Sequence, residues 1–93
     1  MSQRFSIVLA EAVVDDRVSP SALRVLEALG MYVDANGQCV ESLSNIARNL
    51  NFTEQALAKQ IKALRDAGYV EITEMRRNDG GRAANLYTIR WGG

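Results

Sequence analysis

The stretch SLSNIARNLNFTEQALAKQIKALRD, residues 42–66, decides the fold of this 93-residue chain. In its first part, apolar residues recur at the i, i+3, i+4, i+7 spacing of one buried helical face: Leu43, Ile46, Ala47 and Leu50. In its second part, the same face is repeated by Leu57, Ile61 and Leu64. Thr53 stands just before this second part and has the hydroxyl of a good helix N-cap. The stretch therefore predicts two short helices joined by a tight turn.

Two helices this short cannot bury their apolar faces alone, so the rest of the chain must cover them. Ser19 and Pro20 predict the start of an earlier helix, because serine can cap it and proline at the first helical position gives up no hydrogen bond. We expect this helix to run from Ser21 to about Val33, followed by a turn at residues 34–37 and a short strand at residues 38–40.

The C-terminal part of the chain predicts a β-hairpin. Gly68 is the expected left-handed residue that ends the second helix of the pair. Residues 69–75 and 86–91 alternate apolar and polar side chains, with the turn signal Asn-Asp-Gly-Gly at residues 78–81 between them. Because a lone hairpin is marginally stable, we expect it to pair with the strand at residues 38–40.

Residues 1–16 are expected to form an N-terminal extension, and residues 17–93 the domain itself. The sequence leaves open whether residues 4–10 form an edge strand or lead into a short helix over residues 10–16. The apolar residues of this extension are predicted to be surplus to the core and to form a homodimer interface: Phe5, Ile7, Val8, Leu9, Val13 and Val14. Deleting residues 1–14 is then expected to convert a dimer into a monomer.

Charge is unevenly distributed along the chain, although its formal net charge is zero. Residues 1–41 hold three basic and six acidic residues, whereas residues 42–93 hold eight basic and five acidic ones. The absence of histidine and the single Cys39 exclude the usual zinc ligand sets and histidine general-base catalysis. We therefore expect no metal, no cofactor and no catalytic site, and so a protein that is not an enzyme.

Cysteine usage and hydropathy bear on the compartment. Cys39 has no partner for an internal disulfide and the N-terminus does not resemble a signal peptide, which together favour the reducing cytoplasm. No apolar run approaches the about 20 residues that a membrane-spanning helix requires, so no membrane association is expected.

The order of elements resembles a winged helix-turn-helix domain over about residues 17–91. It is similar in particular to modules of phage and plasmid replication proteins and of small transcriptional regulators. The likeness lies in Ser-Pro before a Leu-rich helix, in Ser-Leu-x-x-Ile-Ala from residue 42, in Lys-x-Leu-x-x-x-Gly-Tyr-Val at residues 62–70, and in Asn-Leu-Tyr at residues 85–87. The resemblance implies an α+β fold with a three-helix core and a C-terminal β-hairpin wing.

The same resemblance implies double-stranded DNA as the partner, in plasmid or phage replication initiation or in transcription regulation. The recognition helix, residues 53–66, would enter the major groove, and the basic wing, residues 76–85, would reach the backbone or the adjacent minor groove. Contacts to bases are expected from Gln55, Ala56 and Lys59. Contacts to phosphates are expected from Ser44, Asn45, Thr53 and Lys62. The wing contacts are expected from Arg76, Arg77 and Arg82.

Glu54 departs from the pattern of a DNA-binding helix. Its carboxylate would repel phosphates unless it accepts a hydrogen bond from a cytosine amino group. Glu54 and the zero net charge fit an alternative, a winged-helix module that docks a protein partner, such as a replication or partition adaptor. Gly92-Gly93 fits the end of a domain, so the chain would be the N-terminal module of a longer protein or a small complete regulator.

Overall fold

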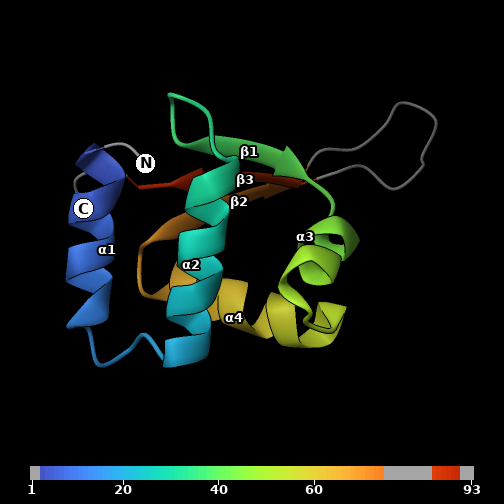
Figure 1. The fold of residues 1–93 in the computed structure, drawn as a ribbon, viewed down its shortest axis with the longest axis horizontal. Coiled ribbons are helices and arrows are strands. Elements are labelled where there is room, and N and C mark those ends of the chain that lie inside the picture. The colour runs from blue at the N-terminus through green and yellow to red at the C-terminus, as the bar shows by residue number, and fades with distance from the viewer. Residues whose placement is uncertain (1–2, 75–84, 91–93) are drawn as a thin grey trace.

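The computed structural model describes residues 3–74 and 85–90 (Figure 1). These residues form four helices and one three-stranded antiparallel sheet, an α+β arrangement. In chain order the elements are α1 (Gln3–Val13), α2 (Pro20–Tyr32), β1 (Gln38–Glu41), α3 (Leu43–Leu50), α4 (Glu54–Asp66), β2 (Val70–Glu74) and β3 (Asn85–Ile89).

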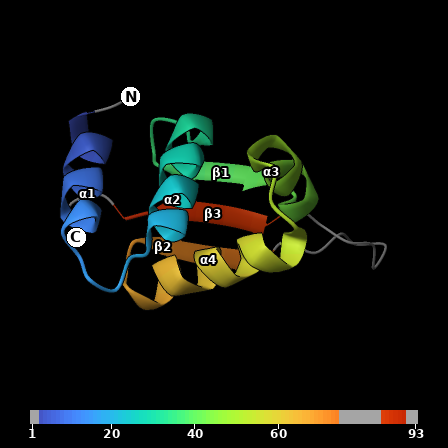
Figure 2. The ribbon, with the colours of Figure 1, turned by 60° about the horizontal axis from the view of Figure 1, so that its bottom comes forward.

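The sheet has the order β1-β3-β2, so the last strand lies in the middle. Tyr87 of β3 is paired with Cys39 of β1 on one side and with Ile72 of β2 on the other. The predicted pairing of the hairpin with the short strand is therefore confirmed. Tyr87 and Ile89 are buried because the helices lie on that face of the sheet (Figure 2).

Helix α2 is the centre of the core and packs directly on α4. Ser19 caps α2 by accepting a hydrogen bond from the Ala22 N–H at 3.1 Å, and Pro20 is the first helical residue, both as predicted. The core also contains the predicted apolar faces of the central helix pair. Its fully buried large side chains include Leu26, Leu29, Ile46, Leu57, Leu64 and Tyr87.

Helix α1 decides the question that the sequence left open, because residues 3–13 are helical and form no strand. Phe5 and Val8 are buried in the common core, where Phe5 packs against Gly30 of α2. The prediction that both residues are surplus to the core is therefore wrong, and a fourth helix adds to the expected three-helix core. Ile7, Val13 and Val14 are exposed.

A polar cluster ties the turn after α1 to the residue before β2. Asp15 accepts hydrogen bonds from Arg17 Nε at 3.0 Å and from a terminal guanidinium nitrogen of the same residue at 2.7 Å. The Tyr69 hydroxyl donates to the same carboxylate at 2.7 Å. The bonds from Arg17, and then that from Tyr69, hold the pKa of Asp15 well below its usual range. The cluster thereby anchors the α1–α2 turn across 54 residues of sequence.

Within the described residues, none of the helices combines the length and the apolar character needed to cross a membrane.

Candidate nucleic-acid interface

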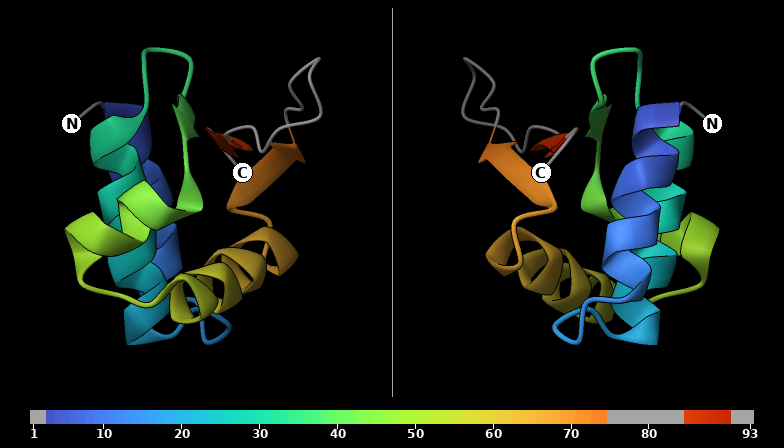
Figure 3. Two further views of the ribbon diagram at one scale, coloured as in Figure 1. Left: turned by 90° about the vertical axis from the view of Figure 1, so that its right-hand side faces the viewer. Right: turned by 90° about the vertical axis from the view of Figure 1, so that its left-hand side faces the viewer.

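Helices α3 and α4 are joined by a turn that fixes their relative orientation (Figure 3). Asn51 ends α3 in the left-handed conformation at φ 59°, which asparagine tolerates better than most residues. Phe52 then donates its backbone N–H to the Ala47 carbonyl at 2.9 Å. Thr53 starts α4 by accepting a hydrogen bond from the Ala56 N–H at 3.1 Å, which confirms the predicted N-cap.

Helix α4 has an apolar inner face and a polar outer face. Leu57, Ile61 and Leu64 are buried against the core. The 3.6-residue helical period places the α4 outer face, defined here as Gln55, Lys59 and Lys62, on the opposite side. All three side chains are exposed, and Ala56 is exposed at the flank of this face. The structure thus leaves the four predicted contact residues of α4 uncovered by described parts of the chain.

Lys59 and Lys62 have unpaired positive charges, as far as the described residues are concerned. The ion pairs in that part of the chain join Arg17 to Asp15, Arg65 to Asp66 and Arg90 to Glu71. Lysine ammonium groups without a protein partner remain available to an anionic ligand. The α4 outer face therefore presents two free positive charges one helical turn apart.

Side chains at the start of α3 from which phosphate contacts were expected already make contacts within the chain. The side-chain amide of Asn45 donates to the Glu41 carboxylate at 2.8 Å, and that carboxylate also accepts from the Ser42 N–H. The Ser44 hydroxyl lies 3.3 Å from that of Ser42. Asn45 was expected to contact a phosphate, and one of the two N–H donors of its amide is engaged by the Glu41 carboxylate.

Thr53 combines its structural role with its expected one. Its side-chain oxygen accepts the hydrogen bond that caps α4, which leaves the hydroxyl hydrogen free to donate. Thr53 is exposed, so this donor faces solvent at the start of the helix. A contact from Thr53 to a phosphate is therefore compatible with its cap.

Arg24 is a residue to which the sequence assigned no role. It reaches from α2 to donate to the Leu50 carbonyl at 3.2 Å, and its guanidinium lies 5.3 Å from the centre of the Phe52 ring. This contact braces the α3–α4 turn against α2. A hydrogen bond from a side chain to a distant backbone carbonyl does not affect the local periodicity of the sequence. The sequence therefore contained no signal that would have predicted this contact.

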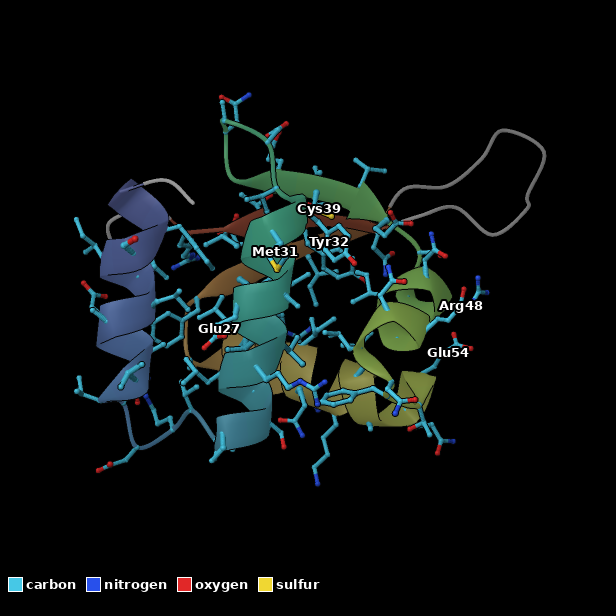
Figure 4. All side chains as sticks on the ribbon, viewed as in Figure 1. Glu27, Met31, Tyr32, Cys39, Arg48 and Glu54 are labelled. Carbon is cyan, nitrogen blue, oxygen red and sulfur yellow. The ribbon has the colours of Figure 1, made fainter. Side chains whose placement is uncertain are left out.

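Arg48, next to the α3–α4 turn, is likewise an arginine without a predicted role. It is exposed in the last turn of α3, and Glu54 is exposed in the first turn of α4 (Figure 4). The two form no ion pair with each other or with another described residue. One further positive and one negative charge therefore flank the turn.

The three arginines predicted for the wing, Arg76, Arg77 and Arg82, lie outside the described residues.

The described residues offer no candidate metal site, since they bring no three side chains of His, Cys, Asp or Glu together. Cys39 is buried in β1, and burial raises the pKa of its thiol, which disfavours the thiolate that would bind a metal or attack a substrate.

Comparison with known proteins finds no family model that matches this chain and no curated protein that matches it.

Proposed function

We propose that the protein is a winged helix-turn-helix domain that binds double-stranded DNA with α4 as its recognition helix. The observation that carries this proposal is the α4 outer face. Gln55, Lys59 and Lys62 are exposed, and the two lysines have no partner among the described residues. The opposite face of the same helix is fully buried, so the outer face is held rigidly for contact with a ligand.

The chemistry of the α4 outer face suits the edges of base pairs in the major groove. That groove is about 12 Å wide and admits a helix. The Gln55 amide can pair with adenine, and Lys59, one turn later, with guanine or a phosphate. Ala56 is small enough to contact a thymine methyl group. Lys62 and Thr53 would bind phosphates and set the register.

The uneven charge supports the same partner. The half of the chain that contains α4 has three more basic than acidic residues, although the whole chain is neutral. Affinity for DNA depends on the charges that meet phosphates, so a neutral protein with its cations on one side still binds. The resemblance to modules of plasmid and phage replication proteins makes replication initiation or transcription regulation the proposed setting.

The experiment that tests this function is selection of bound sequences from random duplex DNA, followed by fluorescence anisotropy on the enriched duplex. We expect Lys59→Ala with Lys62→Ala to abolish enrichment or weaken binding at least tenfold, on the order of 1.4 kcal/mol. Arg90→Ala is the matched control, because Arg90 is paired with Glu71 and directly follows β3. Absence of any enriched motif with the unmodified chain would refute sequence-specific binding.

The acidic residues near the α3–α4 pair favour a second candidate, docking of a protein partner. Glu54 is exposed at the start of α4, and the Glu41 carboxylate lies at the start of α3. Both would repel phosphates but would attract basic side chains of a protein. In that case the selection returns no motif, and Glu54→Gln weakens the complex with the partner. If DNA is the ligand, Glu54→Gln instead strengthens non-specific binding.

A further inference from the structure

Helix α1 has an apolar surface on its exposed side as well as on its buried side. Phe5, Val8 and Ala12 are buried, whereas Ile7 is 51% exposed and Val14, just after the helix, is 80% exposed. The helical period places Ile7 and Ala10 together, opposite the buried residues, and the exposed Val14 directly follows the end of the helix. We call these three residues the α1 outer face. Val13, 62% exposed, lies beside them.

This pattern is unusual for a helix at the surface of a domain. The outward side of such a helix is normally polar, as it is in α4. Figure 1 shows α1 at one end of the molecule, and the right-hand view of Figure 3 shows it in front of the other elements. No described part of the chain covers the α1 outer face, so it is free to contact another molecule.

The charges described around the α1 outer face do not favour an anionic surface as its partner. Glu11 and Asp16 are exposed beside it, and Asp15 already holds Arg17. The described side chains of this region therefore carry net negative charge. This charge would repel the phosphates of DNA or of acidic lipids, which favours a protein as the partner.

The charges at the two ends of α1 favour a second copy of this chain as the protein partner. The helix has no basic residue in its last turn, yet Asp15 and Asp16 follow its C-terminus, where negative charge is unfavourable. It also has no acidic residue in its first turn, where negative charge is favourable. An antiparallel copy of the same helix supplies what is missing, because Asp16 of each protomer then lies beside the positive N-terminal end of its partner.

We propose that the α1 outer face pairs with the same face of a second copy, antiparallel and across a two-fold axis near Ala10. Ala10 is exposed and lies midway between Ile7 and Val14, so a small residue falls where the helices approach most closely. Such an interface is self-complementary, as a two-fold dimer requires. An 11-residue helix is about 16 Å long, so the interface is smaller than that of a stable dimer and the association is weak.

Sedimentation equilibrium of the full chain, without DNA, tests the dimer from micromolar to millimolar concentration. We expect the average mass to rise from one chain toward two. Val14→Glu places a charge in the apolar interface and should weaken association at least tenfold, or about 1.4 kcal/mol. Met31→Glu is the matched control, because Met31 is also 80% exposed but lies on α2. We expect it to associate like the unmodified chain, with equal circular dichroism spectra for all three proteins.

Disulfide trapping tests the antiparallel geometry. Under mild oxidation Ala10→Cys should form a covalent dimer, because the two-fold axis brings its two thiols together. Ile7→Cys should not, since an antiparallel pair keeps the two copies of residue 7 about 9 Å apart along the helices, which is too far for a disulfide. The native Cys39 is only 5% exposed and stays out of this reaction.

Three results would overturn the proposal: a monomer at every concentration, equal loss of association in the Val14→Glu and Met31→Glu variants, or equal trapping at positions 7 and 10. Neither experiment contains DNA. A negative result here therefore leaves DNA binding untouched, and failure of DNA binding leaves the dimer untouched.

Discussion

Asp15 joins the turn after α1 to Tyr69, the residue before β2. Its side chain is only 13% exposed and receives hydrogen bonds from Arg17 and Tyr69. Burial, followed by the bond to Asp15, raises the pKa of Tyr69, so that hydroxyl stays protonated and donates. Because the folded chain holds Asp15 ionised more firmly than the unfolded chain does, this carboxylate stabilises the fold at neutral pH.

We expect Asp15→Asn to lower the melting temperature at pH 7. The pKa of Asp15 is lowered in the folded state, so its stabilisation is present above the ordinary carboxyl pKa of about 4 and is lost as the pH falls below that value. The difference in melting temperature between the variant and the unmodified chain should therefore shrink as the pH falls from about 5 to about 2. This is roughly the range over which such a carboxylate becomes protonated and ceases to stabilise the fold. Thermal melts followed by circular dichroism measure this, with the exposed Asp16→Asn as control. A difference that stays constant with pH would contradict the role of Asp15.

The N-cap of α4 is a second feature at the residue scale. Thr53→Ala removes the acceptor of the Ala56 N–H and should lower the free energy of unfolding by about 1 kcal/mol. Thr53→Ser keeps the acceptor, so its free energy of unfolding should stay roughly within ±0.5 kcal/mol of that of the unmodified chain. Urea denaturation of the three proteins checks the prediction. Equal loss in both variants would mean that the methyl group, and not the cap, stabilises the helix.

At the scale of elements, the packing of α1 on α2 turns an apparent extension into part of the core. A Cβ atom at position 30 would lie 2.0 Å from Cζ of Phe5, so the glycine is what allows the ring to sit on α2. Phe5 is only 1% exposed and its ring has little room to move aside. The two helices therefore pack closely because the Phe5 ring of α1 occupies the space that a side chain at Gly30 of α2 would fill.

Gly30→Ala should destabilise the fold by about 1–3 kcal/mol through overpacking, even though alanine favours a helix over glycine by about 1 kcal/mol. Phe5→Leu should relieve part of the overlap, so the double variant should be more stable than the sum of the two single changes predicts. A double-mutant cycle from urea denaturation measures this coupling. Additive effects would show that the ring and residue 30 do not meet.

Deleting residues 1–14 should now do more than change the oligomeric state. The deletion removes Phe5, Val8 and Ala12, all of which are buried. Loss of one large buried side chain alone costs about 3–5 kcal/mol, so we expect the shortened chain to unfold or to lose most of its stability. A cooperative melt at an unchanged temperature would contradict the place of α1 in the core.

At the scale of the whole molecule, the proposed DNA contact depends on separation of charge. The α4 outer face has two lysines that no described residue neutralises, while the described exposed charges around α1 are acidic apart from Arg17, which is paired with Asp15. We therefore expect a duplex to meet the chain on the side of α4. In the proposed arrangement, one neutral chain would carry both a face for DNA and a face for its own copy.

The salt dependence of DNA binding follows from the number of phosphates that are neutralised. With about four basic residues engaged, the log–log slope of affinity against salt should be roughly −3 to −4. Lys59→Ala should make this slope shallower by about one if Lys59 contacts a phosphate. Fluorescence anisotropy over a range of salt concentrations measures both values. A slope of zero would contradict an interface built on lysine and arginine.

The sequence by itself determined the local elements of this protein. Caps and apolar spacing predicted α2, α3 and α4 and the strand pairing of β1 with the hairpin, because hydrogen-bonding side chains and helical periodicity act over a few residues. It also predicted that Gln55, Ala56, Lys59 and Lys62 face solvent, because Leu57, Ile61 and Leu64 fix the opposite side of α4.

Only the tertiary structure decided what depends on contacts between distant segments. The β-prone residues of α1 gave no clear local signal, and their helix is explained by burial of Phe5 against Gly30, 25 residues away in the chain. Three hydrogen bonds likewise depend on how particular side chains are placed in the folded chain. They join Asn45 to Glu41, Arg24 to Leu50, and Tyr69 to Asp15. Periodicity reports which face of an element is buried, but it does not report which other element covers that face.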